Sequence, residues 1–129
     1  MVKQDVPRPT DAELMILRVL WDLGAGTVKQ VHRALSKDRK TAHTTTLKFM
    51  QIMTDKGLLI RDDSDRPAVY RPAITQEKTQ RQLLRNLLDK AFYGSAGNLV
   101  LRALSMKQTS TREREEIRKL LDELEGDKP

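Results

Sequence analysis

Side chains that can form hydrogen bonds recur between residues 43 and 56, a segment with a single carboxylate. If this segment is a helix, with about 100° per residue, several of them share one side. The side chains on that side are Thr44, Lys48, Gln51 and Asp55, flanked by Thr45, Leu47 and Ile52. Glutamine can form hydrogen bonds with adenine, lysine can bind guanine or a phosphate, and leucine can contact the methyl group of thymine. The chemistry predicted here is recognition of nucleobase edges, and the alternative is an ordinary solvated helix face.

Positive charge is concentrated around the same segment. The chain has 24 Lys+Arg against 18 Asp+Glu, a formal net charge of +6. Residues 29–48 alone hold six lysines and arginines, one aspartate and both histidines of the chain. Such an excess attracts polyanions, nucleic acid among them, although charge also serves plain solubility.

Three further basic residues are candidates for contacts with a phosphate backbone. His43 begins the segment described above, Lys40 lies shortly before it, and Arg66 lies in a polar loop at residues 62–67. Phosphate contacts fix the register of a protein on a duplex but carry no sequence information. Asp62, Asp63 and Asp65 would repel a phosphate, so we expect them to point into solvent.

The sequence offers no catalytic motif. It contains no Gly-x-x-x-x-Gly-Lys phosphate loop, no His-Glu-x-x-His, no dinucleotide-binding glycine pattern and no Gly-x-Ser-x-Gly elbow. The carboxylates of residues 113–125 alternate with basic residues, which is typical of a solvated helix. We therefore predict that the protein is not an enzyme.

The composition excludes several other classes. With no cysteine, the chain has no disulfide, no thiolate metal site and no cysteine nucleophile. No apolar run approaches the roughly 18–20 residues of a membrane span, and residues 1–10 lack the apolar stretch of a signal peptide. We expect a cytoplasmic protein with no membrane insertion, no cofactor and no metal.

Capping residues and apolar spacing predict two helices before the polar segment. Thr10 and Glu13 have the spacing of a capping box, and apolar residues follow at helical intervals until Gly24. Thr27 is placed to cap a second helix over residues 28–35.

The polar segment is predicted to be the third helix, ending at Gly57. Its core-facing side chains are Thr46, Phe49, Met50 and Met53. Residues 58–61 and 68–71 then read as two short strands joined by the polar loop. Such a hairpin is marginal alone and must pack against the helices.

This order predicts a mainly α fold with a small β wing. Residues 1–74 read as a winged helix-turn-helix DNA-binding domain, in which the second and third helices form the helix-turn-helix. The alternative is another small α+β domain that binds protein.

Residues 75–129 are predicted to form a three-helix dimerisation domain. A long helix begins at Thr75, Asn98 is placed to cap a short second helix, and Ser110 and Glu113 have capping-box spacing for the last one. The apolar residues predicted for the interface are Leu84, Leu87, Leu88, Leu99, Val100, Leu104, Ile117, Leu121 and Leu124. Three such helices are too small to bury these side chains alone, so we expect a homodimer. Packing back on the first domain is the alternative.

From about Thr10 to Leu124, the chain resembles the penicillinase-repressor family, the BlaI/MecI group of bacterial winged-helix repressors with copper-responsive CopY relatives. The matching stretches are Ala12–Trp21, Thr27–His32, Thr44 through Leu59, Tyr70–Pro72 and, after a glycine-rich break, Leu99–Leu101. The family's Thr-Val-x-x-Val and its Thr-Thr-rich recognition helix ending in Lys-Gly-Leu are both present. The resemblance implies a dimeric repressor of a palindromic operator.

The chain departs from the family pattern in three places. Ile52–Met53 replaces an Arg-Leu pair near the end of the recognition helix. Members controlled by a membrane sensor protease are cut between Asn and Phe, and the matching positions here are Arg102 and Ala103. The C-terminal cysteine cluster of copper-responsive relatives is absent.

The sequence thus predicts a sequence-specific DNA-binding transcriptional repressor. Its partners would be a double-stranded operator, a second copy of itself and a membrane sensor protease. Release would follow weakening of the dimer or proteolysis. The alternative is a winged-helix adaptor that binds protein and not DNA.

Overall fold

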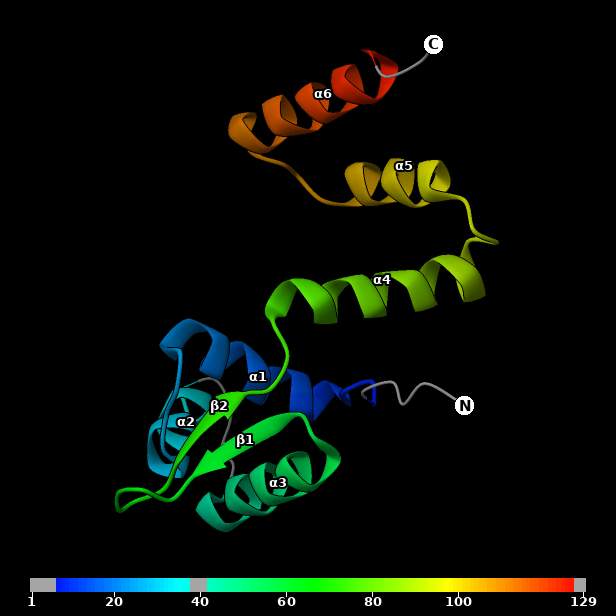
Figure 1. The fold of residues 1–129 in the computed structure, drawn as a ribbon. Coiled ribbons are helices and arrows are strands. Elements are labelled where there is room, and N and C mark those ends of the chain that lie inside the picture. Colours follow the sequence, from blue (N-terminus) through cyan, green and yellow to red (C-terminus); the bar gives the residue numbers. More distant parts are fainter. Residues whose placement is uncertain (1–6, 38–41, 127–129) are drawn as a thin grey trace. The chain divides into compact units, whose positions relative to one another are not determined.

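The computed structural model describes residues 7–37 and 42–126. Its elements are α1 (Asp11–Leu23), α2 (Val28–Leu35), α3 (His43–Lys56), β1 (Leu59–Asp62), β2 (Val69–Pro72), α4 (Gln76–Ala91), α5 (Ala96–Met106) and α6 (Thr111–Gly126) (Figure 1). The predicted mainly α fold with a small antiparallel wing is confirmed.

The described residues fall into two compact units, one extending to Leu84 and the other beginning at Arg85, so α4 contributes to both. No helix within the described ranges has the length and apolar content needed to cross a membrane.

The first two helices begin where their capping residues predict. Thr10 Oγ1 accepts from the backbone N–H of Glu13 at 3.2 Å, and Glu13 Oε1 accepts from the N–H of Thr10 at 2.9 Å. Thr27 and Gln30 repeat the arrangement at the start of α2, at 3.2 and 2.8 Å. N–H groups in the first turn lack intrahelical partners, so these side chains determine where each helix starts.

The third helix has the predicted bounds and the predicted core side. Thr46, Met50 and Met53 are 1%, 0% and 0% exposed, and Phe49 packs against the same cluster. The helix ends at Gly57, whose φ of 87° lies in the left-handed region that favours glycine.

The wing is a short antiparallel hairpin in which Leu59 pairs with Pro72 and Asp62 pairs with Val69. Each strand starts one residue later than predicted. Leu58 does not join β1, because its N–H takes part in the cap that follows α3: it donates to the carbonyl oxygen of Met53 at 2.8 Å.

A backbone bridge attaches the wing to the loop between α1 and α2. Gly26 and Tyr70 exchange two N–H···O hydrogen bonds of 2.9 and 2.8 Å. A Cβ at position 26 would lie 3.3 Å from Leu23 Cδ1 and from Gln30 Oε1, so glycine suits this close approach.

One apolar core joins α1, α2, α3 and the wing. Its buried members are Ile16, Leu17, Leu20, Val31, Met50, Met53, Leu58, Leu59 and Tyr70. Burying a side chain of this size stabilises a fold by about 1.5–3 kcal/mol relative to leaving it exposed. The core therefore holds α3 against α1 and the wing.

An ion pair joins the start of α1 to the end of α3. Glu13 is buried, and Lys56 Nζ donates to its Oε2 at 2.8 Å. Burial alone raises the pKa of Glu13, but the hydrogen bonds from Lys56 and Thr10, together with the charge of Lys56, outweigh it. The net result is a lowered pKa.

In the second unit, the predicted N-cap of one helix is wrong and that of another is confirmed. α5 begins after Ser95, whose Oγ accepts from the N–H of Asn98 at 3.1 Å, so Asn98 lies inside the helix rather than capping it. Ser110 and Glu113 form the predicted reciprocal pair at the start of α6, with both distances 3.0 Å.

Replacing Lys56 with methionine removes the cation from a buried carboxylate. We expect the free energy of unfolding at neutral pH to fall by about 1–3 kcal/mol, measured by urea denaturation followed by circular dichroism. Because the pKa of Glu13 is lowered, its contribution to wild-type stability is present above the ordinary value of 4.5 and is lost as the pH falls through the native value.

The deficit of Lys56→Met relative to wild type should therefore shrink as the pH falls from about 6 to below 4.5. Lys78→Met, at an exposed position of α4, is the matched control and should show no such pH-dependent deficit. An equal Lys56→Met deficit at both pH values would show that the ion pair does not stabilise the fold.

Candidate nucleic-acid interface

Opposite its buried side, α3 presents a polar face. Six of the eight residues predicted to bind DNA lie on this helix: His43, Thr44, Thr45, Leu47, Lys48 and Gln51. All are exposed except Leu47, which is half-buried. The structure thus brings hydroxyl, amide, imidazole and ammonium groups together on one exposed surface.

The start of α3 differs from the starts of α1 and α2. Its N-cap residue is Ala42, which provides no side-chain hydrogen bond; like α2, it has no acidic residue in its first turn. The N-terminus of a helix has partial positive charge and backbone N–H groups that favour anions. This end of α3 is therefore electrostatically suited to a negatively charged partner.

The two remaining predicted residues lie outside α3. Arg66 is exposed in the loop between β1 and β2, where it makes no ion pair with any residue that the structure describes. Lys40 lies outside the described residues.

Two wing carboxylates have partners of their own. Asp63 Oδ1 accepts from Arg61 Nε at 2.7 Å, and Asp62 Oδ1 accepts from the N–H of Ser64 at 2.9 Å. The hydrogen bonding with Ser64 lowers the pKa of Asp62. Asp65 is exposed, as are the other two.

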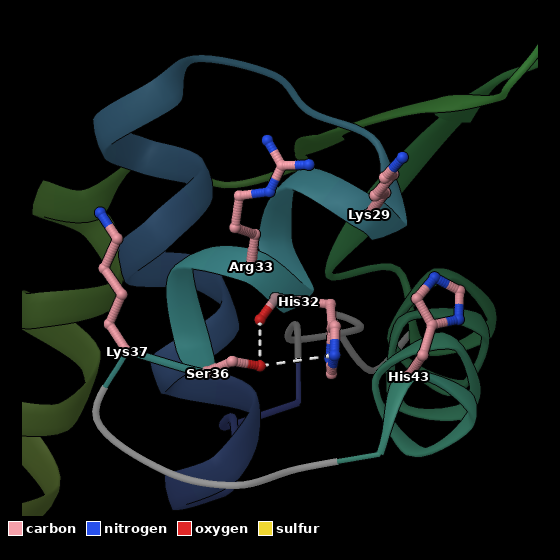
Figure 2. Close-up of a pocket in the computed structure, with 6 residues that line it drawn as sticks. All are labelled: Lys29, His32, Arg33, Ser36, Lys37 and His43. Carbon is pink, nitrogen blue, oxygen red and sulfur yellow. Dashed lines mark hydrogen bonds between the residues drawn. The ribbon is translucent and has the colours of Figure 1, made fainter.

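A basic pocket lies between α2 and the start of α3 (Figure 2). It has a volume of about 500 Å³ and is lined by Lys29, His32, Arg33, Ser36, Lys37 and His43. None of these side chains is acidic. Of these residues, only His43 was predicted to bind DNA. The concentration of positive charge in residues 29–48 was the sequence feature that indicated the others.

The ring of His32 connects the two helices of this pocket. Its Nδ1 lies 3.3 Å from Thr46 Oγ1 on α3, and its Nε2 lies 3.4 Å from Ser36 Oγ at the end of α2. Ser36 Oγ also donates to the carbonyl oxygen of His32 at 2.8 Å. The ring of His43 meets that of His32 edge to face, with centroids 5.3 Å apart.

The described residues contain no group of three or more His, Cys, Asp or Glu side chains that could hold a metal ion.

The residues predicted for a dimer interface lie on α4, α5 and α6. Most are exposed in the single chain; Leu121 and Leu124, for example, are 53% and 58% exposed. Leu88, Leu99 and Ile117 are half-buried. Arg102 and Ala103, the positions matching the family's cleavage site, are exposed within α5.

Known proteins resemble this chain over most of its length. Residues 9–123 match the family model of the penicillinase repressor. The penicillinase repressor of Bacillus licheniformis is 26% identical over 118 residues, covering 92% of each chain. The transcriptional regulator BlaI of Mycobacterium tuberculosis is 28% identical over 117 residues, covering 90% of this chain and 84% of that protein.

Two solution structures share the fold. The Bacillus licheniformis BlaI monomeric form in complex with the blaP half-operator has a TM-score of 0.51 and 27% identity, covering 57% of this chain and 89% of that one. The DNA binding domain of the repressor BlaI matches with the same score and identity, covering 90% of its own chain. With 9–123 of its 129 residues matched by the family model, the chain belongs to the penicillinase repressor family.

Proposed function

We propose that this protein is a DNA-binding transcriptional repressor that binds a palindromic operator as a homodimer. The observation that carries the proposal is the orientation of α3, which buries Met50 and Met53 and exposes Lys48 and Gln51. The solved BlaI relative in complex with a half-operator supports it.

In this function α3 enters the major groove with its N-terminal part closest to the base edges. Gln51 pairs with adenine, Lys48 pairs with guanine or a phosphate, and Leu47 contacts a thymine methyl group. Thr44 and Thr45 add short donors and acceptors beside them. Ile52, which replaces the family's arginine, is an exposed apolar side chain, so this chain has no charged contact there.

Phosphate contacts hold the module in register. We assign Lys40 and His43 to the backbone beside the start of α3, and Arg66 to the backbone under the wing. The ion pair of Asp63 with Arg61 and the hydrogen bond of Asp62 to Ser64 support the assignment of Arg66, because two neighbouring carboxylates are engaged elsewhere.

Dimerisation is assigned to residues 75–129, and DNA binding to residues 1–74. The exposed apolar side chains of α4, α5 and α6 support this division, because exposed leucines at helical spacing are costly in water. A twofold dimer places its recognition helices about 34–36 Å apart, or at a multiple of that spacing, so the operator is an inverted repeat of matching period.

Release from the operator is assigned to loss of the dimer, by proteolysis or by unfolding near residues 96–104. Arg102 and Ala103 lie inside α5, so a protease can cut between them only after that helix opens locally. A membrane sensor protease acting on a repressor in the cytoplasm, where bacterial operators are found, fits this scheme.

The double variant Lys48→Ala, Gln51→Ala tests whether the polar face of α3 recognises DNA bases. The operator is first obtained by sequencing DNA that co-purifies with the protein at low salt. We expect operator affinity to fall by about 1–3 kcal/mol for each side chain that no longer reaches its base, measured by fluorescence anisotropy. Gln80→Ala, Lys119→Ala removes the same residue types from exposed positions of α4 and α6 and should bind as wild type. Unchanged operator binding by a folded double variant would show that this face does not read DNA.

Salt dependence separates a repressor from a protein-binding adaptor. Six phosphate contacts per dimer predict a loss of about 10³ in operator affinity between 50 and 200 mM salt. Duplex retention on a column, eluted with a salt gradient, gives the same answer without a known operator. Binding that is insensitive to salt, or absent, would favour the adaptor.

The apolar face of α6 tests the dimer. Leu121→Asp, Leu124→Asp should convert the protein to monomers in analytical ultracentrifugation and weaken operator binding, because charged side chains oppose apolar burial. Lys119→Asp makes the same total change in charge at a polar position of α6 and should leave the dimer intact. A double variant that remains dimeric would place the interface elsewhere.

A further inference from the structure

Of the residues that the structure describes, those lining the basic pocket between α2 and α3 carry positive charge and include no carboxylate. Among the described residues, the charged and titratable groups that line the pocket with His32 are Lys29, Arg33 and Lys37, from α2 and the residues directly after it, and His43 from α3. Lys29, Arg33 and Lys37 make no ion pair with any residue that the structure describes. Charges that share a concave site repel one another until an anion occupies it.

The hydrogen bonds of His32 determine how its ring accommodates a second proton. Ser36 has one hydroxyl proton, which it donates to the carbonyl oxygen of His32 at 2.8 Å, so Nε2 of the ring donates to Ser36 Oγ. Nδ1 of the neutral ring then accepts from Thr46 Oγ1. When Nδ1 gains a proton, it donates to the same oxygen once the threonine hydroxyl has turned. Both contacts therefore survive protonation.

His43 is the exposed partner of this ring. It lies at the N-terminus of α3, beside Ala42, which supplies no capping acceptor. Figure 2 shows His43 at the start of α3, with the His32 ring between that helix and Ser36. Two imidazolium rings with centroids 5.3 Å apart repel each other, so an anion beside them favours protonation of the pair.

We propose that this pocket binds one phosphate group of the operator backbone, and that operator binding is coupled to proton uptake by His32 and His43. The proposal rests on the proposed function and extends it to named atoms and to a dependence on pH. The ligand chemistry is a phosphate oxyanion, contacted by Lys29 and Arg33 from α2 and by His43 from α3. His32 hydrogen-bonds to Thr46 on the buried side of α3. Protonation of His32 therefore also strengthens the attachment of α3 to α2.

Operator binding should become tighter as the pH falls. Both histidines of the chain line this pocket, and histidine is the protein side chain that most often exchanges a proton near neutral pH. We expect affinity for the full-length dimer to rise by about tenfold per subunit between roughly pH 8 and 6 at constant ionic strength. Calorimetry in buffers of different ionisation enthalpy should give an uptake of about one proton per subunit.

His43→Gln keeps a hydrogen-bonding side chain at an exposed position but cannot gain a proton. It should reduce the proton uptake and flatten the pH dependence of operator affinity. Its circular dichroism spectrum should match that of the wild type. Lys29→Gln is the control for general charge: it should weaken binding at every pH and leave the pH dependence in place. His32→Gln should flatten the pH dependence further, and its thermal melt reports any loss of folding.

Each outcome bears on a different part of the proposal. If wild-type protein fails to bind any duplex at any pH, the proposed function itself is wrong. If it binds its operator with no pH dependence, or if His43→Gln retains the full proton uptake, the repressor function stands and the pocket proposal is overturned. Inorganic phosphate should displace the operator more strongly than chloride at equal ionic strength, because it competes for the same pocket. Equal displacement by the two anions would overturn the phosphate pocket.

Discussion

Burial of Met50 and Met53 determines the rotation of α3 about its own axis, and the rest of the candidate site depends on that rotation. One residue of rotation, about 100°, would carry Lys48 or Gln51 toward the core, where an unpaired charge or amide is costly. The Glu13–Lys56 ion pair anchors the other end of the helix to α1. A single helix can therefore belong to the core and to the interface at once, because the two roles use opposite sides.

Much of this arrangement was predictable because its signals are local. The reciprocal hydrogen bonds of Thr10 with Glu13 and of Ser110 with Glu113 need only a three-residue spacing, and the sequence displays it. Gly57 and the methionines indicated the end and the inner side of α3 for the same reason. The error at Asn98 was also local: two polar residues stood before the same apolar run, and Ser95 is the cap.

The contacts that sequence reasoning missed join residues far apart in the chain. Glu13 meets Lys56, and Gly26 meets Tyr70, only after α1, α3 and the wing have packed together. The pocket around His32 likewise requires α2 and α3 to be side by side, so the charge of residues 29–48 indicated its presence but not its shape. Which side chains touch DNA, and how two copies meet, remain predictions, since those contacts involve molecules outside a single chain.

The indole of Trp21 is hydrogen-bonded across the first unit: its Nε1 donates at 3.0 Å to the carbonyl oxygen of Ile74, just before α4. The chain contains one tryptophan, so its ultraviolet emission comes from a single, half-buried fluorophore at the junction where the winged module leads into the long helix. Separation of α1 from the segment before α4 would break that hydrogen bond, expose the ring to water and shift its emission to the red. The molecule thus carries an intrinsic optical reporter of whether α1 and the start of α4 remain joined.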